Sequence, residues 1–110
     1  MAKTPELSIV VLNWNTRHLL ENCLASIYGC APACEFEVIV VDNNSDENIA
    51  GVREQFREVR LIQNDYNYGF AVANNIGFRE SRGRYVMTLN PDTLMFPGTI
   101  IVLLVFARCW

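Results

Sequence analysis

The sequence predicts an α/β fold in which helices cover both faces of a mostly parallel sheet. Apolar runs rich in β-branched residues alternate with segments whose apolar residues recur at helical spacing. The connections between these runs are long enough for helical crossovers, which make neighbouring strands parallel and the crossovers right-handed. The chain has 110 residues, which suffice for one domain.

Four strands are expected, and the first is the clearest. Residues 8–12 form an unbroken apolar run with β-branched side chains, which is typical of a strand buried on both faces. Similar runs predict a second strand at residues 36–41, a third at 59–63 and a fourth at 84–89.

Three helices are expected between these strands. Asn15 or Thr16 can cap the first helix and Gly29 can end it, whereas Ser45 or Asp46 can cap the second. Small residues in the third helix would allow it to pack closely on the sheet. The apolar faces consist of Leu19, Leu20, Cys23, Leu24, Ile27 and Tyr28; of Ile49, Val52 and Phe56; and of Phe70, Ala73, Asn74, Gly77 and Phe78.

Composition and short motifs exclude several classes of protein. A net charge of -3 argues against a nucleic-acid-binding face, which needs clustered basic residues. The first apolar run ends at Asn13, too early for a signal peptide, so a cytoplasmic start is expected. Cys30 and Cys34 have the spacing of half a zinc site, but no second pair completes it, which favours free thiols.

Asparagine and aspartate follow all four predicted strands. In open parallel sheets, ligands bind outside the carboxyl ends of the strands. We therefore expect Asp42, after the second strand, and Asp92, after the fourth, to face one pocket that holds a nucleotide sugar and its metal ion. The residues at the four strand ends are Asn13 and Asn15; Asp42, Asn43, Asn44 and Asp46; Asn64 and Asp65; and Asn90 and Asp92.

Each of these residues also has an ordinary structural interpretation. Asparagine and aspartate are common in turns and at helix caps, and we interpret Asn44, Asp46 and Asp65 in this way. A pair of carboxylates favours a ligand, since a carboxylate accepts hydrogen bonds from a base or ribose and holds a divalent cation beside phosphate oxygens. Glycine-rich dinucleotide and P-loop motifs and the hydrolase nucleophile elbow are absent from the sequence.

Four segments together resemble the family-2 glycosyltransferases. They are residues 8–15 (SIVVLNWN), 40–46 (VVDNNSD), 67–77 (NYGFAVANNIG) and 89–93 (LNPDT). The resemblance runs from about residue 7 to residue 98. It implies the N-terminal half of a GT-A fold, a Rossmann-like α/β architecture. It also implies transfer of a sugar from a nucleoside-diphosphate donor to an acceptor hydroxyl, usually with inversion, in glycan or polysaccharide synthesis.

The resemblance also assigns roles at the ends of the second and fourth strands. Asp42 matches the carboxylate that contacts the nucleotide base. Asp92 matches the last aspartate of the D-x-D motif, which binds Mg²⁺ or Mn²⁺ through the donor diphosphate. Asn90 stands where the first aspartate of that motif usually lies, beside the ribose. The Asn-Pro-Asp sequence is most similar to rhamnosyltransferase-like members, which implies a UDP- or dTDP-sugar.

Other positions are implied to lie near the donor, and the chain is expected to be incomplete. Asn13 and Asn15 would lie beside the nucleotide, and Asn67, Gly69 and Asn74 beside the donor. The family's catalytic base lies beyond the D-x-D motif, in the half that binds a carbohydrate or lipid-linked acceptor. No catalytic residue is therefore assigned, and the chain alone is expected to be inactive.

The last residues differ in composition from the rest. We expect a donor-binding half-domain at residues 1–98 and an apolar tail at residues 99–110, which contains no acid. A spanning helix needs about 20 apolar residues, so the tail is too short, although contact with the inner face of a membrane stays open. Truncation is the favoured interpretation, with a change of reading frame after Ile100.

Two other functions remain open from the sequence. One is a regulatory module that binds a nucleotide without transferring a sugar. The other is a nucleotidyltransferase, which would need a loop rich in glycine and basic residues after the first strand, where residues 13–18 read NWNTRH. His18 is a candidate general base, but a capping or exposed imidazole is the favoured interpretation.

Overall fold

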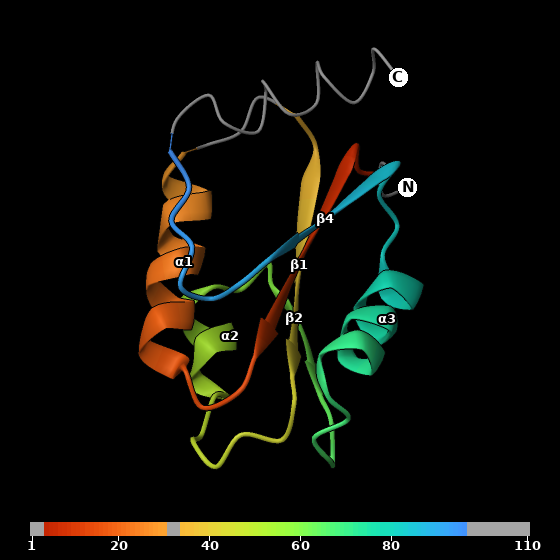
Figure 1. Ribbon diagram of the computed structural model, residues 1–110. Coiled ribbons are helices and arrows are strands. Elements are labelled where there is room, and N and C mark those ends of the chain that lie inside the picture. The colour runs from red at the N-terminus through yellow and green to blue at the C-terminus, as the bar shows by residue number, and fades with distance from the viewer. Residues whose placement is uncertain (1–3, 31–33, 97–110) are drawn as a thin grey trace.

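The computed structural model describes residues 4–30 and 34–96. Four strands in these ranges form one parallel sheet. The strands are β1 (Leu7–Asn13), β2 (Phe36–Asp42), β3 (Arg60–Gln63) and β4 (Tyr85–Leu89). They lie in the order β3-β2-β1-β4, and every neighbouring pair is parallel (Figure 1). The four predicted strands are confirmed to within one residue at each end.

Helices cover both faces of the sheet, as predicted. They are α1 (Arg17–Gly29), α2 (Gly51–Gln55) and α3 (Phe70–Glu80). Helices α1 and α2 lie on one face, and α3 lies on the other (Figure 1). The expected end of the first helix is confirmed, because Gly29 is its last residue.

The larger core lies between the sheet and α1. Alternate strand residues point to this face, and one side of α1 packs against them. Removing so much apolar surface from water is the main force that holds α1 to the sheet. The strand and α1 side chains of this core are Leu7, Ile9, Val11, Val38 and Val40, together with Leu20, Cys23, Leu24 and Ile27.

The core beneath α3 is smaller and closer. Ala73 packs against Val10, Ile39 and Val41. A Cβ on Gly77 would lie 2.5 Å from Val10 Cγ1, so only glycine lets the helix come this near the sheet. The prediction that small residues allow close packing is therefore confirmed.

Two aromatic residues of α3 were placed wrongly on the sheet side. Phe70 is 65% exposed and Phe78 is 42% exposed. The close approach at Ala73 and Gly77 leaves no room for an aromatic ring between the helix and the sheet. Neither ring belongs to the buried cluster beneath α3.

The predicted start of the second helix was also wrong. Helix α2 begins at Gly51, and neither Ser45 nor Asp46 caps it. The Ser45 hydroxyl donates to Asp42, and the Asp46 amide donates to Asn15, so both belong to the turn after β2. The apolar face itself is confirmed, since Ile49 and Val52 are buried and Phe56 packs against them.

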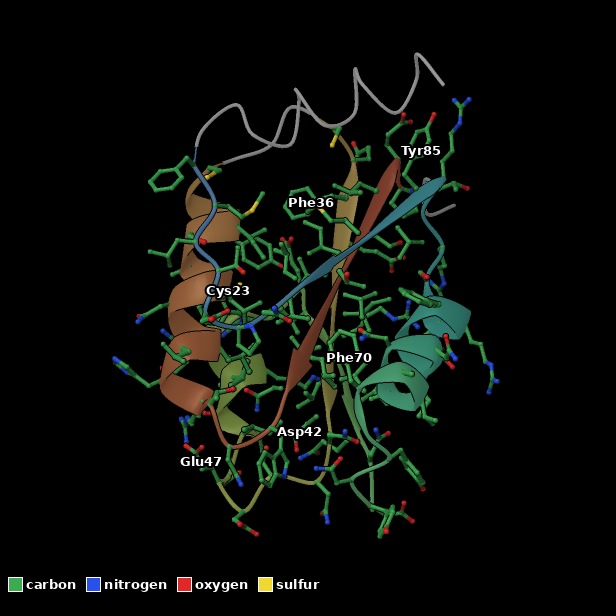
Figure 2. All side chains as sticks on the ribbon, in the orientation of Figure 1. Cys23, Phe36, Asp42, Glu47, Phe70 and Tyr85 are labelled. Atoms are coloured by element: carbon green, nitrogen blue, oxygen red, sulfur yellow. The ribbon has the colours of Figure 1, made fainter. Side chains whose placement is uncertain are left out.

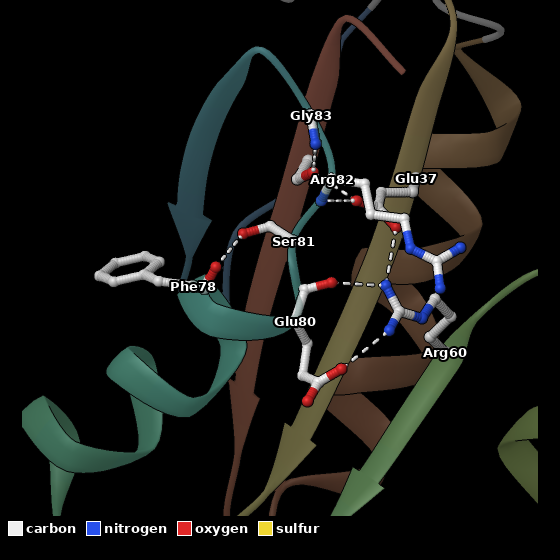
Figure 3. Close-up of polar contacts among 8 residues, drawn as sticks. Glu37, Arg60, Phe78, Glu80, Ser81, Arg82 and Gly83 are labelled. Carbon is white, nitrogen blue, oxygen red and sulfur yellow. Dashed lines mark hydrogen bonds and ion pairs between the residues drawn. The ribbon is translucent and has the colours of Figure 1, made fainter. Parts of the chain in front are cut away.

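A polar network joins the amino ends of β1 and β2 to the connection between α3 and β4 (Figure 3). The Glu37 carboxylate accepts hydrogen bonds from Ser8 Oγ, from Arg82 N at 2.6 Å and from Arg60 Nη1 at 3.1 Å. Gly83 N in turn donates to Ser8 Oγ at 2.7 Å. The polar groups at this end of the sheet therefore form hydrogen bonds with one another.

The predicted C-terminal tail at residues 99–110, like the boundary at residue 98, lies outside the described residues. Among the helices that the structure describes, none combines the length and the apolar character needed to cross a membrane.

Candidate functional site

The candidate site lies where β1, β2 and β3 end. Asn13 pairs with Asp42 in the strand register, and Asp42 pairs with Gln63, so the three carboxyl ends are level. Figure 2 shows Asp42 and Glu47 at this end of the molecule and Phe36 and Tyr85 at the opposite end. Polar side chains thus meet at one edge, as the sequence predicts.

Asp42 is buried in a shell of neutral hydrogen-bond donors. Its side chain is 3% exposed. Oδ1 accepts from Asn13 Nδ2 at 2.9 Å and from Ser45 Oγ at 2.6 Å, and Oδ2 accepts from Ser45 N at 3.0 Å. No basic residue of ranges 4–30 and 34–96 forms an ion pair with it. Within the described ranges, the Asp42 side chain is therefore held by hydrogen bonds from neutral groups alone.

Asn13 and Asn15 hold the turn after β2 in place. Asn13 is fully buried, and its Oδ1 accepts from Thr16 Oγ1 at 2.6 Å. Asn15 has a φ of 53°, a left-handed conformation that asparagine tolerates. Its N donates to Ser45 Oγ at 2.8 Å, and its Oδ1 accepts from Asp46 N at 2.8 Å. The side-chain amides of both residues thus form hydrogen bonds within the protein.

Asn43 is a site residue that the sequence reasoning missed. Its Nδ2 donates to Asn67 Oδ1 at 2.8 Å and to Gly69 O at 3.3 Å. Its Oδ1 accepts from Asn64 Nδ2 at 3.2 Å and from Tyr68 N at 3.0 Å. Since successive strand residues point to opposite faces, a polar residue directly after Asp42 has to reach the α3 side. This alternation along β2 could have predicted from the sequence that Asn43 faces α3.

Asn67, before α3, is hydrogen-bonded through its side chain, whereas the side chain of Asn74, within α3, is not bonded to any described residue. Asn67 Oδ1 accepts from both Asn43 and Gly69 N, and Gly69 has a φ of 83°. Asn74, on α3, is 6% exposed, and its side chain forms no hydrogen bond with any described residue. No buried side-chain nitrogen or oxygen of the described residues lacks a partner, so the polar atoms of the Asn74 amide are accessible to solvent.

Asn90 and Asp92 lie in the exposed turn that follows β4. Thr93 N donates to Asn90 O at 3.0 Å to close this turn. The last residue of β4 pairs with Val11, before β1 ends. No hydrogen bond connects this turn to the Asp42 network within the described part of the chain. That Asp42 and Asp92 face one pocket stays a prediction.

The chain after β4 turns back along α1 (blue segment, Figure 1). Met95 N donates to Ser26 Oγ at 2.9 Å, and Cys30 Sγ donates to Met95 O at 3.2 Å. Burial and the nearby negative charge of Asp92 raise the pKa of Cys23, which lies on α1, to about 11. The segment that follows Asp92 is therefore held against α1 through Met95.

The other metal and acid–base candidates gain no support. Within the ranges that the structure describes, no group of three or more His, Cys, Asp or Glu side chains could hold a metal ion. His18 is exposed on α1, which agrees with the favoured interpretation of this residue. Asp65 accepts a hydrogen bond from the Tyr68 hydroxyl at 2.8 Å, and this bond raises the pKa of Tyr68.

Comparison with known protein families identifies the chain. Residues 8–108 match the family described as glycosyl transferase family 2. The match covers most of the chain, which therefore belongs to this family. The predicted resemblance is confirmed.

Curated relatives support the same family. A chondroitin synthase of Escherichia coli is 33% identical over 90 residues, which cover 78% of this chain and 13% of that protein. An uncharacterized glycosyltransferase of Haemophilus influenzae is 32% identical over 91 residues, which cover 83% of this chain and 31% of that protein. The chain thus spans less than a third of either relative.

Solved structures share the fold. Staphylococcus aureus TarS 1-349, in complex with UDP-GlcNAc, superposes with a TM-score of 0.81 at 21% identity, over 94% of this chain and 31% of that one. The mannosyltransferase PcManGT from Pyrobaculum calidifontis, in complex with GDP-Man and Mn²⁺, gives a TM-score of 0.78 at 26% identity, over 90% and 31%. The predicted Rossmann-like GT-A architecture is confirmed.

Proposed function

We propose that this chain is the donor-binding part of a glycosyltransferase and binds a UDP- or dTDP-sugar together with Mg²⁺ or Mn²⁺. The observation that carries the proposal is the buried Asp42 carboxylate, which among the described residues has neutral donors around it and no ion-pair partner. Family membership and the nucleotide-sugar complexes of two structural neighbours support the choice of ligand.

Asp42 is proposed to contact the nucleotide base. A carboxylate has about four acceptor positions, and the protein fills three of those on Asp42. One position therefore remains for an N–H group of the base. Such a charge-assisted bond in a poorly hydrated place is stronger than one between neutral groups.

Asp92 is proposed to hold the metal ion, with Asn90 beside the ribose. Mg²⁺ commonly takes only one or two protein carboxylates and completes its coordination with phosphate oxygens and water. An exposed carboxylate that faces a diphosphate fits this pattern, so the absence of a described metal cluster is compatible with it. A bound divalent cation would offset the charge of the departing nucleoside diphosphate.

The remaining predicted residues are proposed to shape the site. Asn13, Asn15, Asn67 and Gly69 hold the turns that surround the donor, because their polar groups bond to the protein. Asn74 has an amide without a partner among the described residues, which suits contact with a donor hydroxyl.

The parent enzyme is proposed to transfer the sugar with inversion to a hydroxyl of a carbohydrate or lipid-linked acceptor. Such a reaction needs a general base within reach of that hydroxyl. No residue of the described ranges is assigned this role. Relatives extend well beyond the matched region, and the chain alone is expected to bind the donor without turnover.

Calorimetric titration of the chain with UDP and with dTDP, each with and without Mn²⁺, tests this function. We expect both nucleotides to bind, and to bind more tightly when Mn²⁺ is present. Circular dichroism of the same sample would establish that the protein is folded. Folded protein that shows no metal-dependent nucleotide binding would contradict the proposal.

A further inference from the structure

Strand β3 is an edge strand whose outer backbone groups are free. Among the described strands it pairs only with β2. Asn64 N donates to Asp42 O at 2.8 Å, and backbone groups two residues apart along a strand point the same way, so the N–H groups of Leu61 and Gln63 point away from β2. Neither of these residues forms a backbone hydrogen bond with a described segment beyond the sheet. Both can therefore pair with a strand from outside the fold.

Few of the usual protective features are present on this edge. Natural edge strands are commonly blocked by proline, by a bulge or by charged side chains. The sequence of β3, RLIQ, contains no proline. Its charged residue, Arg60, is bonded to Glu37 and to Glu80 on α3. Since β3 has four residues, it can pair with a short segment only.

A surface hollow of about 480 Å³ lies beside this edge, between β3 and the segment that contains α2. Leu61 and Gln63, whose outer backbone groups are free, also contribute their side chains to it. The hollow and the free edge therefore form one continuous surface. The described residues that line the hollow are Ala50, Arg53, Glu54, Arg57, Leu61 and Gln63.

Two arginine side chains of this hollow have no partner in the described part of the chain. Arg53 and Arg57 form neither an ion pair nor a side-chain hydrogen bond with any described residue. Glu54 is the one acidic side chain among the described lining residues, so the lining carries a net positive charge. Because a guanidinium has five donors in a fork that matches a carboxylate, acidic side chains fit this surface.

We propose that the edge of β3 is a docking site for an acidic, extended segment of a partner protein. The segment adds to the sheet beside β3 through backbone hydrogen bonds with Leu61 and Gln63. Alternate side chains of an added strand point to one face, so its acidic side chains reach Arg53 and Arg57 on the α2 side. Backbone bonds then supply affinity and the two arginines supply selectivity. None of these four residues belongs to the proposed donor site, so docking is a separate function.

The first test measures the fluorescence anisotropy of a labelled peptide in which glutamate and valine alternate over about six residues, the usual length of a strand. A peptide with lysine in place of glutamate is the matched probe. We expect the acidic peptide to bind the unaltered chain about tenfold more tightly, the effect of one hydrogen bond between charged groups. Equal binding of the two peptides, or binding of neither, would overturn the proposal.

The added strand is tested by Gln63→Pro, because proline removes the outward N–H and is accepted in edge strands. This variant should bind the acidic peptide about fivefold more weakly, the effect of one backbone hydrogen bond. Gln63→Ala keeps the N–H and should bind normally, as should Thr88→Pro, which makes the same change on β4 at the opposite edge of the sheet. Unchanged binding to Gln63→Pro, or equal losses in the three variants, would show that no strand is added beside β3.

Circular dichroism of each variant would establish that it is folded. If Gln63→Pro does not fold, an acidic peptide that is N-methylated at alternate residues removes the same hydrogen bonds from the ligand side. That peptide should also bind about fivefold more weakly to the unaltered chain. Full affinity of the methylated peptide would exclude strand addition.

The arginines are tested by combining Arg53→Gln with Arg57→Gln, which should weaken the acidic peptide about tenfold. The matched control combines Arg79→Gln with Arg82→Gln, two exposed arginines at the end of α3 and just after it. Equal losses in the two double variants would show general charge attraction and overturn the proposal. Analytical ultracentrifugation completes the test, since self-association that Gln63→Pro abolishes would assign the edge to a second copy of the chain instead.

Discussion

Strand β2 carries a carboxylate at each end, and the two have opposite surroundings. Glu37, near the amino end, bonds to the guanidinium of Arg60, which also bonds to Glu80 (Figure 3). Asp42, at the carboxyl end, bonds to neutral donors alone within residues 4–30 and 34–96. Among the described residues, Glu37 is paired with a cation and Asp42 is not.

The two carboxylates also differ in which parts of the fold they connect. Burial works to raise the pKa of Glu37, but hydrogen bonds from Ser8 and Arg82 and the charge of Arg60 lower it overall. These partners come from β1, β3 and the connection between α3 and β4, so Glu37 joins distant elements of the fold. The described partners of Asp42 lie at the end of β1 and in the turn after β2, so Asp42 joins elements at the carboxyl edge of the sheet only.

Disruption of the amino end should have the largest effect on stability. A Cβ at Gly83 would lie 2.5 Å from Ser8 N and 2.8 Å from Leu7 C, so backbone atoms would have to move. We expect Gly83→Ala to lower the free energy of unfolding by about 3 kcal/mol, the upper part of the usual range for overpacking. Urea denaturation would measure it.

Gly29→Ala is the control for this change, because a Cβ there meets nothing within 4 Å. It should leave stability unchanged or raise it slightly. Equal losses in the two variants would mean that the contact between Gly83 and Ser8 is not decisive.

Removal of the carboxylate at the other end should instead affect binding. Asp42→Ala should weaken uridine binding by about 2 kcal/mol, the value of a hydrogen bond to a charged group, whether or not Mn²⁺ is present. Calorimetry with uridine would measure it, and Glu37→Gln should bind uridine normally. Unchanged binding to Asp42→Ala would show that Asp42 does not contact the base.

Asp92 should contribute only when the metal is present. We expect Asp92→Asn to remove most of the gain in UDP affinity that Mn²⁺ provides, about tenfold or 1.4 kcal/mol. UDP titrations with and without Mn²⁺ would separate the two contributions. Equal losses under both conditions would exclude Asp92 as the metal ligand.

Glu37 should make stability depend on acid pH. Its pKa in the folded protein is below the ordinary value of 4.5, so its stabilisation is present above that value and is lost as the pH falls through the lower folded pKa. Glu37→Gln should cost about 1 kcal/mol at neutral pH, since the network is partly solvent-exposed, and less in acid. Urea denaturation at several pH values would test this, and a pH-independent difference would contradict it.

The strands and α1 were predictable because their apolar patterns match their burial. Residues 8–12 read as buried on both faces, and cores do lie on both sides of β1. The start of α2 was not predictable, since Ser45 bonds to Asp42 instead of a helix amide. That choice depends on where β1 places Asn13 and Asn15, which no local pattern shows.

Within the site, sequence reasoning found the strand ends but could not assign the partners of each amide. Asn13, Asn15 and Asn43 look alike in the sequence, yet Asn13 and Asn15 bond to the end of β2 and the turn after it, whereas Asn43 bonds to the loop before α3. The position of Asp92 depends on how Met95 is held against α1. Such contacts follow from packing between distant segments, which residue spacing does not encode.

Deamidation of Asn43 would change the hydrogen bonds at this edge of the protein. Its amide nitrogen supplies both donors that hold Asn67 and Gly69, next to the start of α3. Spontaneous deamidation to aspartate would replace these donors with acceptors and set a negative charge against the oxygens of Asn67 and Gly69. Ageing of the protein should therefore loosen the loop before α3, which mass spectrometry combined with hydrogen exchange would detect.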